Sequence, residues 1–181
     1  MSTRIISRSL LIIEKIISFL MTAIMANIFS YSDIGFWSQA LFSASLFTTI
    51  VGFDIPNAII AIVPRIKNSK EKYELVYKSI LFILIVGIFF CINLIFFKDF
   101  ISKILFNKIL DLNIFIKILT IGFCDLLLYF ILYAYRSVKN FSYSNYVLIL
   151  RILPRIVAII GILKNNINLL LNLYSATYFF V

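Results

Sequence analysis

Two arginines, Arg151 and Arg155, are the residues of this chain best suited to chemistry on an anion. They lie four positions apart within a long apolar run, and this spacing places both on one face of a helix. A guanidinium presents its N–H donors in a rigid fork that matches phosphate oxygens. Pro154 beside them frees a backbone carbonyl near residue 150. The pair is therefore a candidate site for a phosphate or diphosphate. Alternatively, the arginines reach an interface or pair with Asp125 or Asp54.

Three acidic residues also lie within apolar runs: Glu14, Asp54 and Asp125. A charge at the centre of a bilayer costs about 2.5–3.5 kcal/mol on insertion scales, so such a residue faces a bundle interior or a wet cavity. We expect these acids to balance the charge of intramembrane arginines or to couple transport to a cation. Asp125 could instead pair with Lys117 or Arg151. Asp54 could instead satisfy backbone groups freed by the proline that follows it.

The sequence lacks the residue combinations of common enzymes. It has no Gly-rich phosphate loop, no Ser/His/Asp or Cys/His arrangement and no acidic pair at metal-ligand spacing. The chain contains no histidine, and Cys91 and Cys124 lie inside apolar runs without a nearby second cysteine. We therefore expect no catalytic residue, no metal site and no cofactor.

Long apolar runs from end to end must position these residues. The chain is 62% hydrophobic with a mean hydropathy of +1.05, and roughly 20 apolar residues cross a bilayer core of about 30 Å. The runs do not alternate apolar with polar residues as barrel strands do. The sequence predicts an all-α polytopic membrane protein, a single bundle of about six transmembrane helices. The predicted spans are residues 10–29, 36–64, 75–97, 112–135, 142–163 and 167–181, the last of them incomplete.

The net charge of +9 is explained by the membrane rather than by nucleic acid. Most basic residues lie between the apolar runs, where topology and anionic headgroups account for them. Because cytoplasmic segments carry the excess of Lys and Arg, the larger set predicts a cytoplasmic N-terminus. That set is Arg4, Arg8, Arg65, Lys67, Lys70, Lys72, Arg136 and Lys139, against Lys98, Lys103, Lys108 and Lys164 in the segments on the other side.

Three stretches carry a resemblance to a known family. The first is a turn ending in Gly35 and an aromatic-rich span, SYSDIGFWSQALFSASLFTTI; the second is a mid-span break and a small-residue run ending at Arg65, VGFDIPNAIIAIVPR. The third is a span, a basic turn and a span, FILYAYRSVKNFSYSNYVLILRILPRIVAIIGIL. The layout resembles the N-terminal part of the lipid-linked oligosaccharide flippases, Wzx-type polysaccharide biosynthesis proteins grouped with the multidrug and toxin extrusion transporters. Where that family often has a glycine after the break, this chain has Asp54-Ile55-Pro56-Asn57.

The resemblance implies the first bundle of a two-bundle transporter in the bacterial inner membrane. Such proteins flip an undecaprenyl-diphosphate-linked oligosaccharide for O-antigen, a part of lipopolysaccharide, or for capsule. Their two bundles rock about a cationic cavity, in which Arg151 and Arg155 would bind the substrate. The implied partners are the bilayer, the lipid-linked oligosaccharide, the polysaccharide polymerase and other assembly proteins. The chain would be a fragment or truncated reading frame, or would need a second half from another chain.

Two other functions stay open on the sequence alone. A drug or cation-coupled exporter of the same superfamily would depend on intramembrane acids rather than on arginines. A membrane assembly or anchoring subunit would not transport at all. A membrane glycosyltransferase or polymerase needs a catalytic acid in an exposed loop, and the loops predicted here are short and basic.

Overall fold

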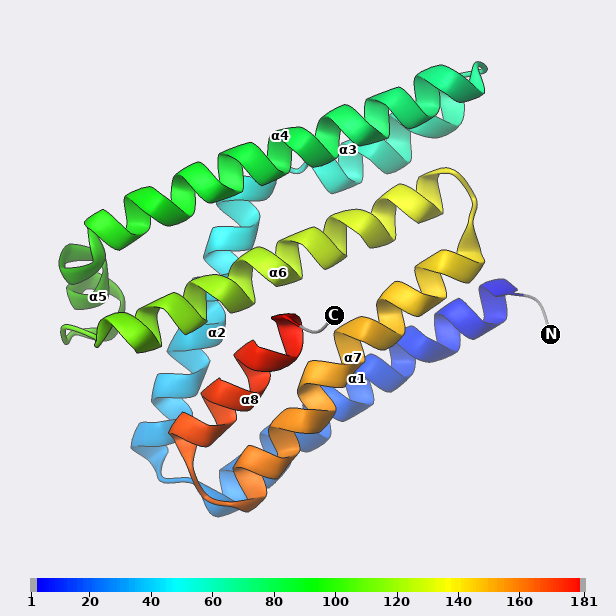
Figure 1. The fold of residues 1–181 in the computed structure, drawn as a ribbon. Helices are drawn as coiled ribbons and strands as arrows, with labels where there is room; N and C mark the ends of the chain where they lie inside the picture. The colour runs from blue at the N-terminus through cyan, green and yellow to red at the C-terminus, as the bar shows by residue number, and fades with distance from the viewer. Residues whose placement is uncertain (1–2, 180–181) are drawn as a thin grey trace.

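Helices make up every regular element of the computed structural model, which describes residues 3–179 (Figure 1). The predicted all-α class is confirmed. Within residues 3–179, five helical segments are long and apolar enough to cross a membrane: Ile5–Ile28, Tyr31–Gly52, Ser69–Phe96, Leu112–Ser137 and Phe141–Leu163. The elements are α1 (Thr3–Ile28), α2 (Tyr31–Gly52), α3 (Ile55–Ile62), the short 3-10 helix η1 (Val63–Arg65), α4 (Ser69–Phe96), α5 (Lys98–Phe106), α6 (Leu112–Ser137), α7 (Phe141–Leu163) and α8 (Ile167–Phe179).

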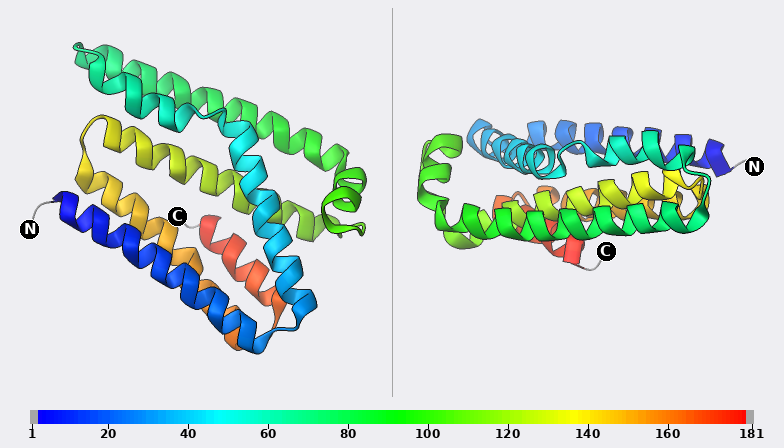
Figure 2. Two further views of the ribbon diagram at one scale, coloured as in Figure 1. Left: turned by 180° about the vertical axis from the view of Figure 1, so that it is seen from behind. Right: turned by 90° about the horizontal axis from the view of Figure 1, so that it is seen from above.

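The helices form two layers (Figure 2). One layer contains α1, α2 and α3, and the other contains α4, α6, α7 and α8. Between the layers, α1 packs on α7, while α2 and α3 pack on α6. Within the second layer, α8 packs against both α7 and α6. Helix α6 therefore contacts both layers and holds the bundle together.

Apart from the break between α2 and α3, the connections between helices lie at two opposite ends of the bundle (Figure 1). The start of α1, the α3–α4 connection and the α6–α7 connection lie at one end, which we call the basic end. The α1–α2 and α7–α8 connections and helix α5 lie at the other. The larger predicted set of basic residues falls on segments of the basic end, and the smaller set falls on segments of the opposite end.

The structure divides the predicted span 36–64 into two helices. Helix α2 begins earlier, at Tyr31, because the Ser30 side chain caps it and accepts a hydrogen bond from the backbone N–H of Asp33 (3.2 Å). It ends at Gly52, since Phe53 and Asp54 adopt the left-handed conformation with φ of 43° and 56°. Helix α3 then starts with a proline in its first turn. The last predicted span, 167–181, forms α8, and residues 180–181 fall outside the described part of the chain.

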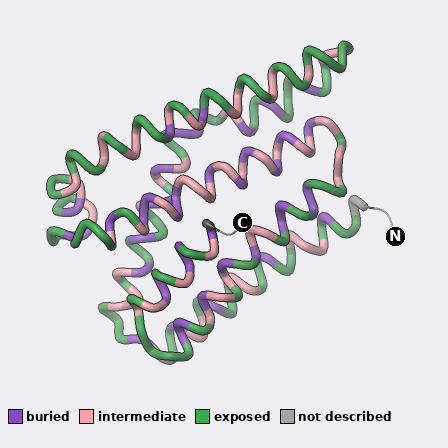
Figure 3. The backbone as a smooth tube through the Cα atoms, viewed as in Figure 1, coloured by how far each residue is buried: buried purple, intermediate pink, exposed green. Residues whose placement is uncertain are grey.

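Buried residues are frequent along α6 and sparse along α4 (Figure 3). One buried cluster joins α1, α2, α6, α7 and α8, and a second joins α2, α3, α4 and α6. Close helix contact depends on two glycines: a Cβ on Gly122 would lie 3.0 Å from the Ala44 carbonyl oxygen, and one on Gly161 would lie 2.5 Å from the Cα of Leu170. The outer faces of α1 and α4 expose large apolar side chains such as Phe19 and Phe89. Such surfaces suit lipid.

Candidate functional site

A cavity of about 950 Å³ opens between α1 and α2. These helices meet at their short connection and diverge from it (Figure 2). Helices α6, α7 and α8 also line the cavity. The charged residues in its lining are Asp54, Asp125, Arg151 and Arg155. Four of the five residues proposed from the sequence therefore face one cavity.

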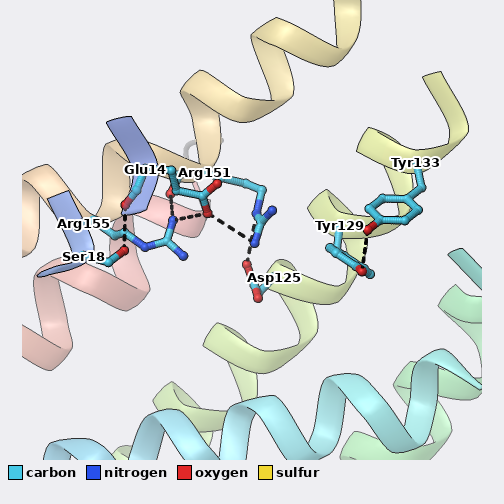
Figure 4. Close-up of polar contacts among 7 residues, drawn as sticks. All are labelled: Glu14, Ser18, Asp125, Tyr129, Tyr133, Arg151 and Arg155. Carbon is cyan, nitrogen blue, oxygen red and sulfur yellow. Dashed lines mark hydrogen bonds and ion pairs between the residues drawn. The ribbon is translucent and has the colours of Figure 1, made fainter. Parts of the chain in front are cut away.

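Glu14, the fifth, is the buried centre of an ion-pair cluster (Figure 4). Its Oε1 atom lies 3.0 Å from a terminal nitrogen of Arg155 and 3.5 Å from one of Arg151. Its side chain is only 6% exposed, whereas those of Arg151 and Arg155 are 13% and 17% exposed. One carboxylate from α1 thus holds both arginines of α7. Since charges removed from water need such partners, the cluster also joins α1 to α7.

Arg151 has two further neighbours on α6. Its Nε atom lies 3.5 Å from Oδ1 of Asp125, but neither atom makes a hydrogen bond to any described residue. This contact is therefore an ion pair without hydrogen-bond geometry. The guanidinium carbon of Arg151 also lies 5.7 Å from the ring centroid of Tyr129, within cation–π range. Arg151 consequently bridges α1 and α6.

Local helix geometry sets the direction of the two arginines. Because they are four residues apart, they share a face of α7, which is a continuous helix through Pro154. A terminal nitrogen of Arg155 donates a 2.7 Å hydrogen bond to the Arg151 carbonyl oxygen. This contact folds the Arg155 side chain back along its own helix, toward Glu14.

The cluster contains two cations and two anions. The sequence left open whether the arginines form a cationic patch or pair with acids. The structure places them in the cavity and pairs them, Arg151 with Glu14 and Asp125, and Arg155 with Glu14. Paired carboxylates lower the cost of burying guanidinium groups. The long contacts to Arg151 leave N–H donors of its fork available to an anion.

Comparison with known proteins places this chain in a family. The chain matches the family model described as polysaccharide biosynthesis protein over residues 5–177. The chain belongs to the polysaccharide biosynthesis protein family. No curated protein and no solved structure matches it.

In this polysaccharide biosynthesis family member, Asp54 lies apart from the arginine cluster. It occupies the cap position of α3 but makes no capping hydrogen bond through its side chain. The alternative that Asp54 satisfies backbone groups freed by Pro56 therefore does not hold for its carboxylate. Among the described contacts, the Asp54 carboxylate accepts a hydrogen bond from Asn57 (2.5 Å) and forms no ion pair with an arginine.

Sequence reasoning missed the aromatic part of the family member's cavity. Tyr129, Trp37, Tyr174 and Tyr178 all line it. The hydroxyl group of Tyr129 lies 2.8 Å from that of Tyr133, one turn along α6 (Figure 4). The spacing of Asp125, Tyr129 and Tyr133 at four-residue intervals was a usable signal, because it places all three on one face of a helix.

No group of three or more His, Cys, Asp or Glu residues that could hold a metal ion occurs within residues 3–179.

Proposed function

We propose that this protein provides a transmembrane bundle of a flippase for undecaprenyl-diphosphate-linked oligosaccharides, used in O-antigen or capsular polysaccharide synthesis. The proposal rests on one observation: Arg151 and Arg155 line a large cavity within apolar helices. An arginine fork binds phosphate oxygens through two parallel hydrogen bonds. A diphosphate headgroup is the part of a lipid-linked sugar that most needs such partners inside a membrane.

The carboxylates give the site a way to release its substrate. Glu14 and Asp125 neutralise the arginines. An arriving diphosphate competes with these carboxylates for the guanidinium donors. When the diphosphate leaves, the carboxylates again compensate the arginines. This competition limits the affinity of the arginines for the diphosphate, so the headgroup can bind and can also be released.

The proposed protein is a transporter and not an enzyme, so the diphosphate linkage crosses the membrane intact. It acts by alternating access, with a second bundle facing the cavity. The basic end lies in the cytoplasm of a bacterium, because cytoplasmic segments of inner-membrane proteins carry the excess of Lys and Arg. Polysaccharide polymerase and other assembly proteins are the proposed partners.

A second candidate function is a cation-coupled exporter of the same superfamily. One observation favours it: the acids of the cluster equal the arginines in number, and Glu14 is more deeply buried than either arginine. A buried carboxylate that exchanges its arginine partner for a proton or a metal cation could couple transport to an ion gradient.

Substitution of the arginines separates the two functions. We expect Arg151→Ala and Arg155→Ala each to lower surface polysaccharide at least tenfold at equal membrane level, and Arg→Lys to rescue only in part because lysine lacks the fork. Lys15→Ala is the matched control. It also removes one cation, next to Glu14 in the sequence, but the Lys15 side chain is exposed. Unchanged polysaccharide in both alanine variants would refute the flippase. Dependence on Glu14 with no dependence on the arginines would favour the exporter.

A further inference from the structure

A polar pair lies at the break between α2 and α3, on a different wall of the cavity from the arginines. Asp54 and Asn57 line the cavity and are both exposed. The Asn57 side-chain amide donates a 2.5 Å hydrogen bond to Oδ1 of Asp54. The second carboxylate oxygen of Asp54, Oδ2, has no hydrogen-bond partner among the described residues. The Asp54 carboxylate forms no ion pair with any of them. The two side chains are therefore bonded to each other and remain accessible from the cavity.

Asp54 and Asn57 are exposed although they lie near the middle of the bundle. The break follows a 22-residue helix and lies about halfway along α4 and α6 (Figure 1). A carboxylate at the centre of a bilayer and irregular backbone at that depth are both tolerated only where they face a wet cavity or protein. Because no described cation neutralises Asp54, its position suits a polar ligand in the cavity.

The charge of Asp54 decides which part of a substrate it can bind. A carboxylate and a diphosphate are both anions, so they repel each other at close range. The arginine wall therefore suits the diphosphate, and the wall at the break suits an uncharged group rich in hydroxyls. A carboxylate accepts from several hydroxyls, and an amide both donates and accepts. Ser45, Thr48 and Thr49 of α2 add hydroxyl groups to the lining.

We propose that Asp54 and Asn57 bind hydroxyl groups of the oligosaccharide, while Arg151 and Arg155 bind the diphosphate of the same molecule. This inference rests on the proposed flippase function. It assigns to the α2–α3 break the recognition of the sugar, so the break contributes specificity and the arginines contribute headgroup binding. Asp54 acts here as a sugar ligand and not as a counter-ion of the arginines.

The intrinsic fluorescence of Trp37 provides the measurement, because it is the single tryptophan of the chain and lines the cavity. The purified full chain is titrated in detergent with two probes. One is undecaprenyl diphosphate, and the other is undecaprenyl diphosphate carrying the complete oligosaccharide, extracted from the cells that make this protein. We expect the wild type to bind the second about tenfold more tightly, which is about the effect of one hydrogen bond to a charged group.

The variants test which residues cause the tighter binding of the probe that carries the oligosaccharide. Asn57→Ala and Asp54→Asn should reduce the tenfold preference to about twofold or less. Asp54→Asn should also bind bare undecaprenyl diphosphate slightly more tightly, because a repulsive charge is gone. Asn27→Ala is the control: its side chain bonds to the Ala23 carbonyl oxygen of its own helix and should keep the full preference. Thermal unfolding of each variant shows that it remains folded.

The outcomes separate this inference from the function on which it rests. If the wild type binds neither probe, the flippase proposal fails. If the wild type binds both probes equally, or if folded Asp54→Asn and Asn57→Ala keep the full preference, the sugar site is refuted and the headgroup site stands. If Asp54→Asn weakens both probes equally, Asp54 serves a cation or the headgroup, and the inference is again overturned.

Discussion

Glu14 and Lys15 are adjacent in the sequence and have opposite surroundings. The Glu14 side chain is buried against two arginines, and Lys15 lies exposed on the outer face of α1. Successive residues of a helix point about 100° apart, so one turn of α1 presents Glu14 to the arginines of α7 and Lys15 away from them. Arg155 has no other ion-pair partner within the described residues. The carboxylate of Glu14 therefore matters to stability as well as to any role in transport.

We expect Glu14→Gln to destabilise the protein by about 3 kcal/mol, because removal of one partner leaves a buried charge without compensation. Thermal unfolding in detergent measures this effect. Lys15→Gln also removes one charge, and it should unfold at the wild-type temperature. The double variant Glu14→Gln/Arg155→Gln should recover part of the loss, since the two residues interact directly. Equal unfolding temperatures for Glu14→Gln and the wild type would contradict the buried cluster.

The sequence predicted these residues better than it predicted their partners. Charged residues inside apolar runs are rare, so Glu14, Asp125, Arg151 and Arg155 could be selected from their positions in the sequence alone. The sequence also offered possible partners, among them Asp125 for Arg151, but it could not select the pairs that form, because these depend on which faces of α1, α6 and α7 meet. The aromatic lining was missed for a related reason: tyrosines near apolar runs are also common at membrane interfaces.

At the scale of elements, the break in α2 shows how much backbone geometry the sequence conceals. The resemblance and Pro56 both pointed to a break near residue 54. The earlier start at Tyr31 depends on the Ser30 cap, and the end at Gly52 depends on two consecutive left-handed residues, Phe53 and Asp54. Neither is glycine, which adopts this conformation most easily. Local propensity therefore did not locate the ends of these helices.

The contact between α7 and α8 depends on Gly161 and can be tested against Gly35. A Cβ on Gly161 would lie 2.5 Å from the Cα and 2.7 Å from the backbone nitrogen of Leu170, whereas one on Gly35 would meet nothing within 4 Å. We expect Gly161→Ala to cost about 1–3 kcal/mol, because the two helices must move apart. Gly35→Ala should be neutral or stabilise by up to about 1 kcal/mol, since alanine favours a helix.

Thermal unfolding of the two glycine variants in the same detergent gives the comparison. If Gly161→Ala unfolds at or above the temperature of Gly35→Ala, α8 does not pack on α7 as the structure has it.

At the scale of the whole molecule, apolar length predicted the all-α class, and the alternation of apolar spans predicted which basic segments share an end of the bundle. Both signals come from partition between water and lipid, which acts on each segment independently. The two-layer packing could not be predicted in this way, because it depends on close contacts such as that of Gly122 with the α2 backbone. The geometry of the bundle also does not determine which of its ends faces the cytoplasm, so the membrane orientation requires its own measurement.

Single cysteines at the two ends measure that orientation. In a background where Cys91 and Cys124 are replaced by alanine, we place cysteine at Lys67, Lys139, Asn107 or Lys164, all of them exposed. A membrane-impermeant maleimide added to spheroplasts should label positions 107 and 164 at once, and positions 67 and 139 only after permeabilisation. This result follows if the basic end faces the cytoplasm. The reverse labelling would leave the fold intact and refute a cytoplasmic N-terminus. Labelling of 67 and 139 from different sides would contradict the fold itself. These positions fall in the α3–α4 and α6–α7 connections, which lie at one end of the bundle (Figure 1).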